Sequence, residues 1–143
     1  MTEAEAEIRR LIDGRIAAMR AKDAAAAVAC LAGDVVAFEL APPLVLPPGA
    51  ARDAAAFAAW LSAFEEIDVE VRDLMIEAAE DVGFAHALHH LTGTRARGHK
   101  VDLWMRSTLC FRREPDGWRI AHAHTSVPFY MDGSFRAAVD LQP

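Results

Sequence analysis

The hydrophobic pattern of the first thirty residues predicts two helices. Apolar side chains recur at intervals of three or four residues, which places them on one face of a helix: Ile8, Leu11, Ile12, Ile16 and Met19. Thr2 followed by Glu5 is a capping-box start for this helix. After Asp23, an N-cap residue, we expect a shorter alanine-rich helix through Leu31 that ends at Gly33 and Asp34.

A strand and a third helix follow. The β-branched and aromatic residues from Val35 to Leu40 favour a strand. Prolines then prevent regular pairing: Pro42, Pro43, Pro47 and Pro48. Asp53 begins another helix, in which large apolar side chains share one face at helical spacing: Phe57, Trp60, Leu61 and Phe64. This helix therefore offers an aromatic face for packing.

From Ile67 onward the period changes to two, which is the period of strands. Turns near residues 81–83, 95–99 and 115–117 separate strands of about ten residues, and such short connections require antiparallel pairing. Helices followed by long antiparallel strands predict a single α+β domain over residues 1–143, with helices packed on one face of the sheet. Because long strands coil as they twist, we expect a curved sheet that encloses a cone.

The last strand carries two histidines, His122 and His124, two residues apart. Strand alternation places both on one face with Trp118 and Ile120. On the preceding strands Arg106 and Thr108 share a face, as do His86 and His90, whereas His89 points the other way. We therefore expect one polar face with the following members: His90, Arg106, Thr108, His122 and His124. The aromatic helix face around Trp60 is expected to lie opposite this polar face. A shift of one residue in the strand register would move the side chains of a strand to the other face of the sheet.

Composition restricts the class of partner. The formal net charge of −6 disfavours nucleic acid, because phosphates would be repelled. The acidic start MTEAEAEIRR is unlike a secretory signal, and the longest apolar run, Ala24 to Ala32, is far shorter than the ~20 residues of a membrane-spanning helix. Cys30 and Cys110 have no metal-type spacing and are interpreted as free thiols of a reducing compartment. We expect a cytoplasmic protein with no membrane partner.

Three stretches resemble a known family: FELAPPL, WMRSTLCFRREPDGWRIAHAHTSVPF and MDGSFRAAVDLQP. They are similar to the SnoaL-like, ketosteroid-isomerase-related branch of the nuclear transport factor 2-like superfamily, and the likeness covers nearly the whole chain. The HxHxS pattern also resembles the association domain of calcium/calmodulin-dependent kinase II. The resemblance implies a cone-shaped fold, a pocket between helices and curved sheet, and a homodimer formed through the sheet. Two positions depart from the pattern, since Ala123 replaces an acid and Glu39 replaces an aspartate.

Glu39 and His122 are the candidate catalytic residues. A carboxylate in an apolar pocket has a raised pKa and can move a proton, with a histidine as its partner. Ketosteroid isomerases also need a tyrosine, but the only tyrosine here is Tyr130, near the C-terminus, so steroid isomerisation is disfavoured. The alternative is a structural or solvent-facing Glu39.

The candidate ligand-binding residues are Phe38, Trp60, His90, Arg106, Thr108 and His124. The histidine pair has three interpretations: structural hydrogen bonding, ligand contact, or metal binding with His90 or Glu39 as a third ligand. Arg106 is suited either to a ligand carboxylate or to a cross-strand ion pair. No spacing is typical of a metal site, so we expect neither a metal nor another cofactor.

Three classes of function remain. The leading hypothesis is a homodimer that binds a small organic ligand, with isomerase- or hydrolase-like acid–base catalysis as a further step. The second is a binding module with the same pocket and no turnover. The third is an association module in which the sheet dimerises. An inward-facing histidine pair is the expectation on which the first two depend.

Overall fold

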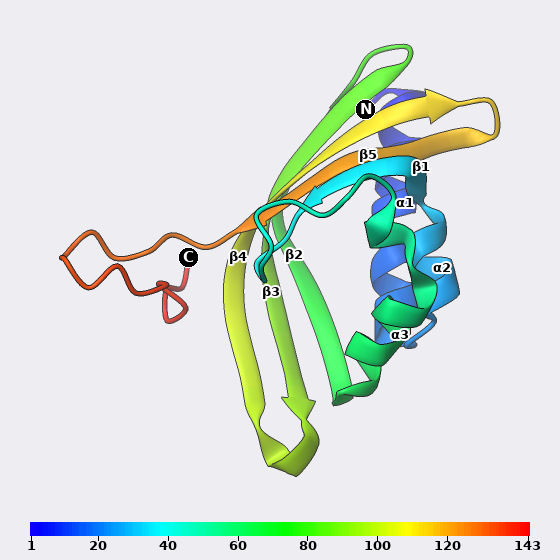
Figure 1. The fold of residues 1–143 in the computed structure, drawn as a ribbon. Helices are drawn as coiled ribbons and strands as arrows, with labels where there is room; N and C mark the ends of the chain where they lie inside the picture. The colour runs from blue at the N-terminus through cyan, green and yellow to red at the C-terminus, as the bar shows by residue number, and fades with distance from the viewer.

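The structure, a computed structural model, describes residues 1–143 (Figure 1). Its helices are α1 (Glu3–Arg20), α2 (Ala24–Ala29) and α3 (Ala54–Ser62), with short 3₁₀ turns η1 (Ala50–Arg52) and η2 (Ala96–Gly98). Its strands are β1 (Leu31–Phe38), β2 (Phe64–Ala78), β3 (Val82–Arg95), β4 (Lys100–Glu114) and β5 (Gly117–Ser126). The α+β class predicted from the sequence is confirmed.

The five strands form one curved sheet in the order β1-β5-β4-β3-β2. The strands β2 to β5 make the predicted antiparallel meander, whereas β1 joins the sheet parallel to β5. All three helices lie on one side of the sheet, and the chain after β5 projects away from them (Figure 1). We call the side covered by the helices the concave face and the opposite side the outer face.

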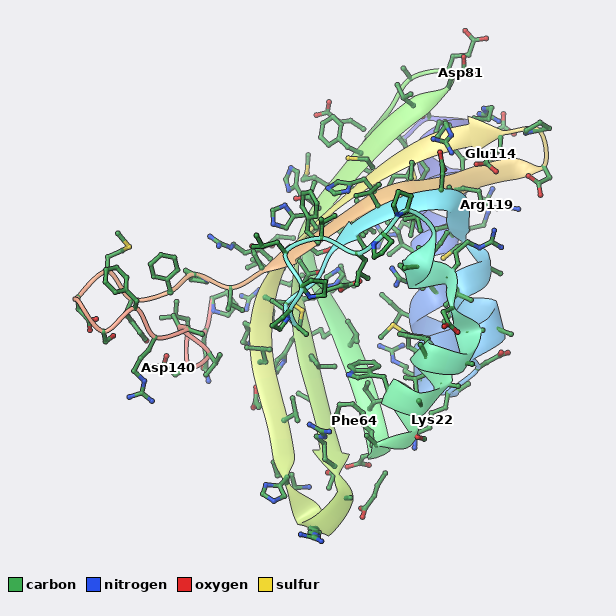
Figure 2. All side chains as sticks on the ribbon, in the orientation of Figure 1. Lys22, Phe64, Asp81, Glu114, Arg119 and Asp140 are labelled. Carbon is green, nitrogen blue, oxygen red and sulfur yellow. The ribbon has the colours of Figure 1, made fainter.

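The first helix forms as predicted because its signals are local. The Thr2 hydroxyl accepts from the backbone N–H of Glu5, and the Glu5 carboxylate accepts from the N–H of Thr2 in return. At its other end the Lys22 ammonium donates to the carbonyl oxygens of Phe64 and Glu65, which fastens α1 to the start of β2 (Figure 2). The buried face of α1 therefore has a fixed position over the sheet.

Several predicted boundaries were wrong. The alanine-rich helix ends at Ala29, and β1 already begins at Leu31, because Leu31 and Ala32 are buried in the core and pairing with β5 outweighs the local turn signal of Gly33. The third helix ends at Ser62, so Phe64 is the first residue of β2 rather than part of the helical face. The strands β2, β3 and β4 are also longer than expected, with 15, 14 and 15 residues.

The hydrophobic core lies between α1 and the concave face. It contains Ile8 and Ile12 from α1, Val35 from β1, and Trp118 with Ile120 from β5, all of them buried. Burial of such side chains contributes roughly 1.5–3 kcal/mol each. This packing fixes which side chains of each strand face inward and which face outward.

Candidate functional site

A β-bulge in β5 decides where the two histidines point. Phe111 of β4 lies opposite Ile120, but Cys110 lies opposite His122, so Ala121 is an extra residue without a partner. A bulge reverses the phase of alternation beyond it. Trp118 and Ile120 therefore face the helices, whereas His122 and His124 lie on the outer face. The expectation that both imidazoles project into the cone was wrong.

The outer face does bring the sequence-predicted polar residues together. Thr108 lies opposite His124, Arg106 opposite Ser126 and adjacent to Leu88, and His90 opposite Trp104. The Phe38 ring packs edge-on against the imidazoles of His122 and His124, with ring centroids 4.7 and 5.4 Å apart. Their common face was predicted correctly. The prediction that this face points toward the helices was wrong. Trp60, which was expected to oppose it, lies on α3 on the other side of the sheet.

Three of these side chains have partners within the chain. The Nδ1–H of His122 donates to the carbonyl oxygen of Val36, 2.7 Å away, and the Arg106 Nε–H donates to the Ser126 hydroxyl at 3.2 Å. His90 stacks on Trp104 with ring centroids 4.3 Å apart. Such contacts are those of residues that stabilise a sheet surface.

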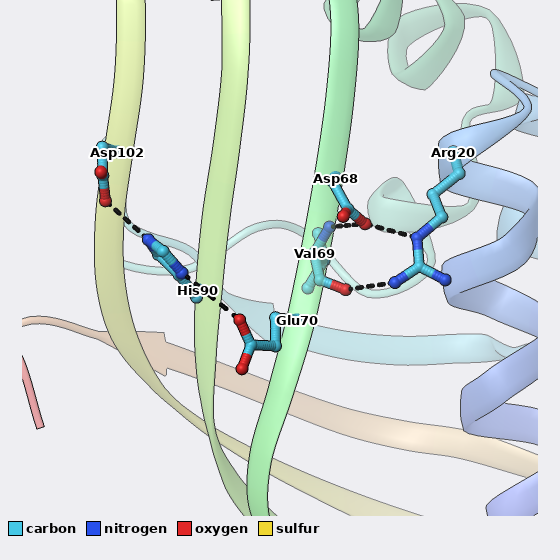
Figure 3. Close-up of polar contacts among 6 residues, drawn as sticks. All are labelled: Arg20, Asp68, Val69, Glu70, His90 and Asp102. Atoms are coloured by element: carbon cyan, nitrogen blue, oxygen red, sulfur yellow. Dashed lines mark hydrogen bonds and ion pairs between the residues drawn. The ribbon is translucent and has the colours of Figure 1, made fainter.

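His90 also lies between two carboxylates of the outer face (Figure 3). Its Nε2 is 2.6 Å from an Asp102 oxygen, and its Nδ1 is 3.7 Å from an oxygen of Glu70. Both carboxylates are exposed, so solvent weakens these ion pairs. No group of three His, Cys, Asp or Glu side chains is placed to hold a metal ion.

Glu39 lies in a groove where β1 ends beside the end of β5. The groove has a volume of about 490 Å³ and is lined by Phe38, Glu39 and His124 together with residues 40–44 and 125–127. Glu39 is exposed there. The apolar burial expected for a catalytic carboxylate is therefore missing, and the histidine that shares the groove with Glu39 is His124 rather than its predicted partner His122.

The concave face carries a different polar group, formed by Arg15, His89 and Ser107. Burial, and secondarily the positive charge of Arg15, lower the pKa of His89 to about 4, so this imidazole is neutral at pH 7. The Arg15 Nε is buried without a hydrogen-bond partner. Ser107 is only 6% exposed. None of the three side chains makes a hydrogen bond or ion pair within the chain.

The register of the sheet places His89 and Ser107 close together. His89 lies opposite Met105, and Ser107 lies opposite Ala87 on β3 and Thr125 on β5. His89 and Ser107 are thus diagonal neighbours on one face, within reach of a shared small molecule. Arg15 approaches them from α1, and its charge acts on both His89 and the Cys30 thiol.

A cavity of about 370 Å³ opens beside this group, between α1 and the edge strand β2. Its lining residues are Arg9, Asp13, Ile16, Arg20, Val69, Val71, Asp73 and Leu74. The three polar residues do not line this cavity themselves. Val71, which does, lies opposite His89 in the sheet, so the cavity is one residue away from the polar group. Arg20 is occupied there, since it pairs with Asp68 and donates to the carbonyl oxygen of Val69 at 3.0 Å (Figure 3).

Sequence reasoning missed Arg15, although the signal was present. Arg15 lies within the apolar stripe of the first helix, four residues after Leu11 and four before Met19. A charged residue at such a position is directed toward the core and calls for a partner. Strand alternation predicts that His89 lies on the face opposite to that of His90, and the observed register confirms this.

Comparison with known proteins identifies relatives of this architecture. The family model described as SnoaL-like domain matches residues 8–130. An NTF2-like protein of unknown function from Pseudomonas putida KT2440 is 30% identical, with a TM-score of 0.86 over 100% of this chain and 99% of that chain. None of the curated proteins matches.

Two further solved structures share the fold at lower identity. A ketosteroid isomerase-like protein from Erwinia carotovora is 19% identical, with a TM-score of 0.71 over 88% of this chain and 97% of that one. A putative calcium/calmodulin dependent protein kinase II association domain from Xanthomonas campestris is 19% identical, with a TM-score of 0.71 over 84% of each chain. No helix of this chain combines the length and the apolar composition needed to cross a bilayer.

Proposed function

This chain belongs to the SnoaL-like domain family, and from that premise we propose that it binds a small organic molecule between its helices and the concave face of its sheet. The observation that carries the proposal is the partly buried Arg15 side chain, whose Nε has no partner and whose charge acts on a neutral His89. A cavity of about 370 Å³, lined by the neighbouring Ile16 and Val71, lies next to it. Cavities of ~300–1,000 Å³ are typical of small-molecule sites.

The energetics of this group favour a ligand over a purely structural role. Burying a polar or charged group without a partner costs free energy, and structural networks normally satisfy every member. In this group the Arg15 Nε is enclosed without a partner, and the side chains of His89 and Ser107 make no hydrogen bond within the chain. A ligand that hydrogen-bonds to them removes this cost, while its apolar part contacts side chains such as Met105 and Val71.

Binding is better supported than turnover. A neutral imidazole can accept a proton, but a pKa of about 4 makes His89 a weak base at pH 7. Glu39 and His122, the candidate catalytic pair, lie at the exposed groove and on the outer face. Catalysis by that pair would have to take place outside the cone.

Chemical-shift mapping tests the interior site. A fragment mixture of small aromatic and aliphatic acids and amides is added to isotope-labelled protein, and backbone amide shifts are recorded. We expect the largest changes at residues 12–19 of α1 and around His89 and Ser107. Changes confined to residues 38–44 and 124–127 would instead assign binding to the outer groove and refute the interior site.

A second candidate function is self-association through the outer face of the sheet. No helix covers this face (Figure 1), and it exposes large apolar side chains, with Phe84 42% and Met75 52% exposed. The segment after β5 projects away from the helices and exposes further apolar residues: Phe129, Met131 and Phe135. We propose that a second copy of the chain covers these side chains in a homodimer.

Light scattering during size exclusion measures the oligomeric state. We expect a dimer for the wild type and a monomer for Phe84→Arg, because a charge placed against apolar side chains of the partner is strongly unfavourable. Leu44→Arg, a matched control in an exposed loop, should remain dimeric. A wild type that stays monomeric at 100 μM, or a dimer that Phe84→Arg leaves intact, would contradict this assignment.

A further inference from the structure

Arg15 has no counter-ion on any element that packs around it. Its helical neighbours three and four residues away are apolar: Leu11, Ile12, Ala18 and Met19. The concave-face residues of the strands opposite are also uncharged at pH 7: Val71, His89, Met105, Ser107 and Thr125. Asp13 and Asp73 line the adjoining cavity without an ion pair to Arg15, and Asp68 of β2 is paired with Arg20.

A partly buried cation surrounded in this way lacks electrostatic compensation within the chain. Moving a charge out of water costs several kcal/mol unless an opposite charge and further hydrogen bonds compensate it. Long cationic side chains usually extend into solvent when no partner is available, but the Arg15 side chain is only partly exposed and its Nε is enclosed. The guanidinium presents several N–H donors in a planar fork, a geometry that matches the two oxygens of a carboxylate.

We propose that the ligand of the concave site is a small organic monocarboxylate whose carboxylate is bound by the Arg15 guanidinium. This inference rests on the proposed function, since it specifies the chemical class of the same ligand. His89, neutral at pH 7, supplies one ring N–H donor, and the Ser107 hydroxyl supplies another. The apolar part of the molecule lies against Met105 and Val71.

The charge balance favours a monocarboxylate over a phosphate ester. Arg15 contributes one positive charge, and His89 contributes none at pH 7, so one negative charge neutralises the site. A phosphate carries about two negative charges and would leave an excess charge in a low-dielectric interior. A neutral amide or alcohol of the same shape would leave the guanidinium uncompensated.

Calorimetric titration with matched probes tests this inference. The probes are benzoate and hexanoate, each paired with its neutral amide, benzamide and hexanamide, at pH 7. We expect each acid to bind about ten- to a hundredfold more tightly than its amide, as a charge-assisted hydrogen bond predicts. Arg15→Met should abolish this preference, and Arg15→Lys should retain only part of it because the planar fork is lost.

The matched control is Arg10→Met, which removes the same charge from an exposed position of α1 and should keep the preference for acids. Thermal melting confirms that each variant is folded. Equal binding of acids and amides would overturn the carboxylate inference but leave the proposed function standing. Failure of all four probes to bind at millimolar concentration would overturn both. A preference lost equally in Arg10→Met would show that general charge, rather than Arg15, attracts the acids.

Discussion

Protonation of His89 should weaken the fold as the pH falls. The ordinary pKa of this imidazole in an unfolded chain is 6.5, and burial together with the charge of Arg15 lowers it to about 4 in the folded state. Below pH 6.5 the unfolded chain therefore takes up a proton that the folded chain does not. The stability contributed by neutral His89 is complete above pH 6.5 and is lost as the pH falls toward 4.

The size of the effect follows from the two pKa values. Each unit of difference corresponds to 1.36 kcal/mol, so the gap between 6.5 and about 4 corresponds to about 3 kcal/mol. This is a large share of the ~5–15 kcal/mol by which domains are stable. The groups that face His89 add no compensating negative charge, since Val71 and Met105 flank it in the sheet and Arg15 approaches it from α1.

Urea unfolding followed by circular dichroism at pH 7, 6, 5 and 4.5 measures this loss. Other groups titrate over the same range, so the informative quantity is the difference between the wild type and His89→Leu. We expect this variant to lose about 2–3 kcal/mol less than the wild type between pH 7 and 4.5. His86→Leu, a control at an exposed histidine of the outer face, should follow the wild type. Parallel curves for the wild type and His89→Leu would refute the burial of a neutral imidazole.

Three further substitutions test the packing of the interior. Arg15→Met should raise the free energy of unfolding of the ligand-free protein by about 1–2 kcal/mol in urea titrations, because a partly buried cation with an unpartnered Nε is replaced by an apolar chain; a marked loss would show that Arg15 has a partner. Ile120→Ala should cost about 2–5 kcal/mol, since this side chain is fully buried, and a loss below 1 kcal/mol in the same assay would contradict the assigned core. Gly49→Ala should lower the melting temperature, because Gly49 has φ +80° and a Cβ there would lie 2.6 Å from the Gly33 carbonyl oxygen; an unchanged melting temperature would place this loop differently.

Local signals made the helices and the strand meander predictable. The apolar spacing of α1 and the Thr2–Glu5 capping box depend only on nearby residues. The antiparallel meander follows from short turns, and its faces on β3 and β4 follow from simple alternation. The end of α2 was misplaced because the burial of Leu31, a tertiary effect, outweighed the turn signal of Gly33.

The candidate site could be predicted only in part, because the face to which a strand side chain points depends on the register of strand pairing. Alternation correctly grouped Thr108 with His124 on one face. The extra residue Ala121 cannot be recognised from the sequence, since it is defined by the pairing of β4 with β5. This single bulge places the histidine pair on the outer face. Arg15 was overlooked because an arginine in a helix is usually solvent-facing, and only the enclosure of its unpartnered Nε distinguishes it.

The most direct test of an interior ligand site is a crystal structure of the protein soaked with 4-iodobenzoate, in which anomalous scattering locates the iodine. We expect one strong peak between α1 and the concave face, with the carboxylate on the Arg15 guanidinium and the ring beside Met105. A peak only in the outer groove near Phe38 and Glu39, or no interior peak at a saturating concentration, would contradict the account.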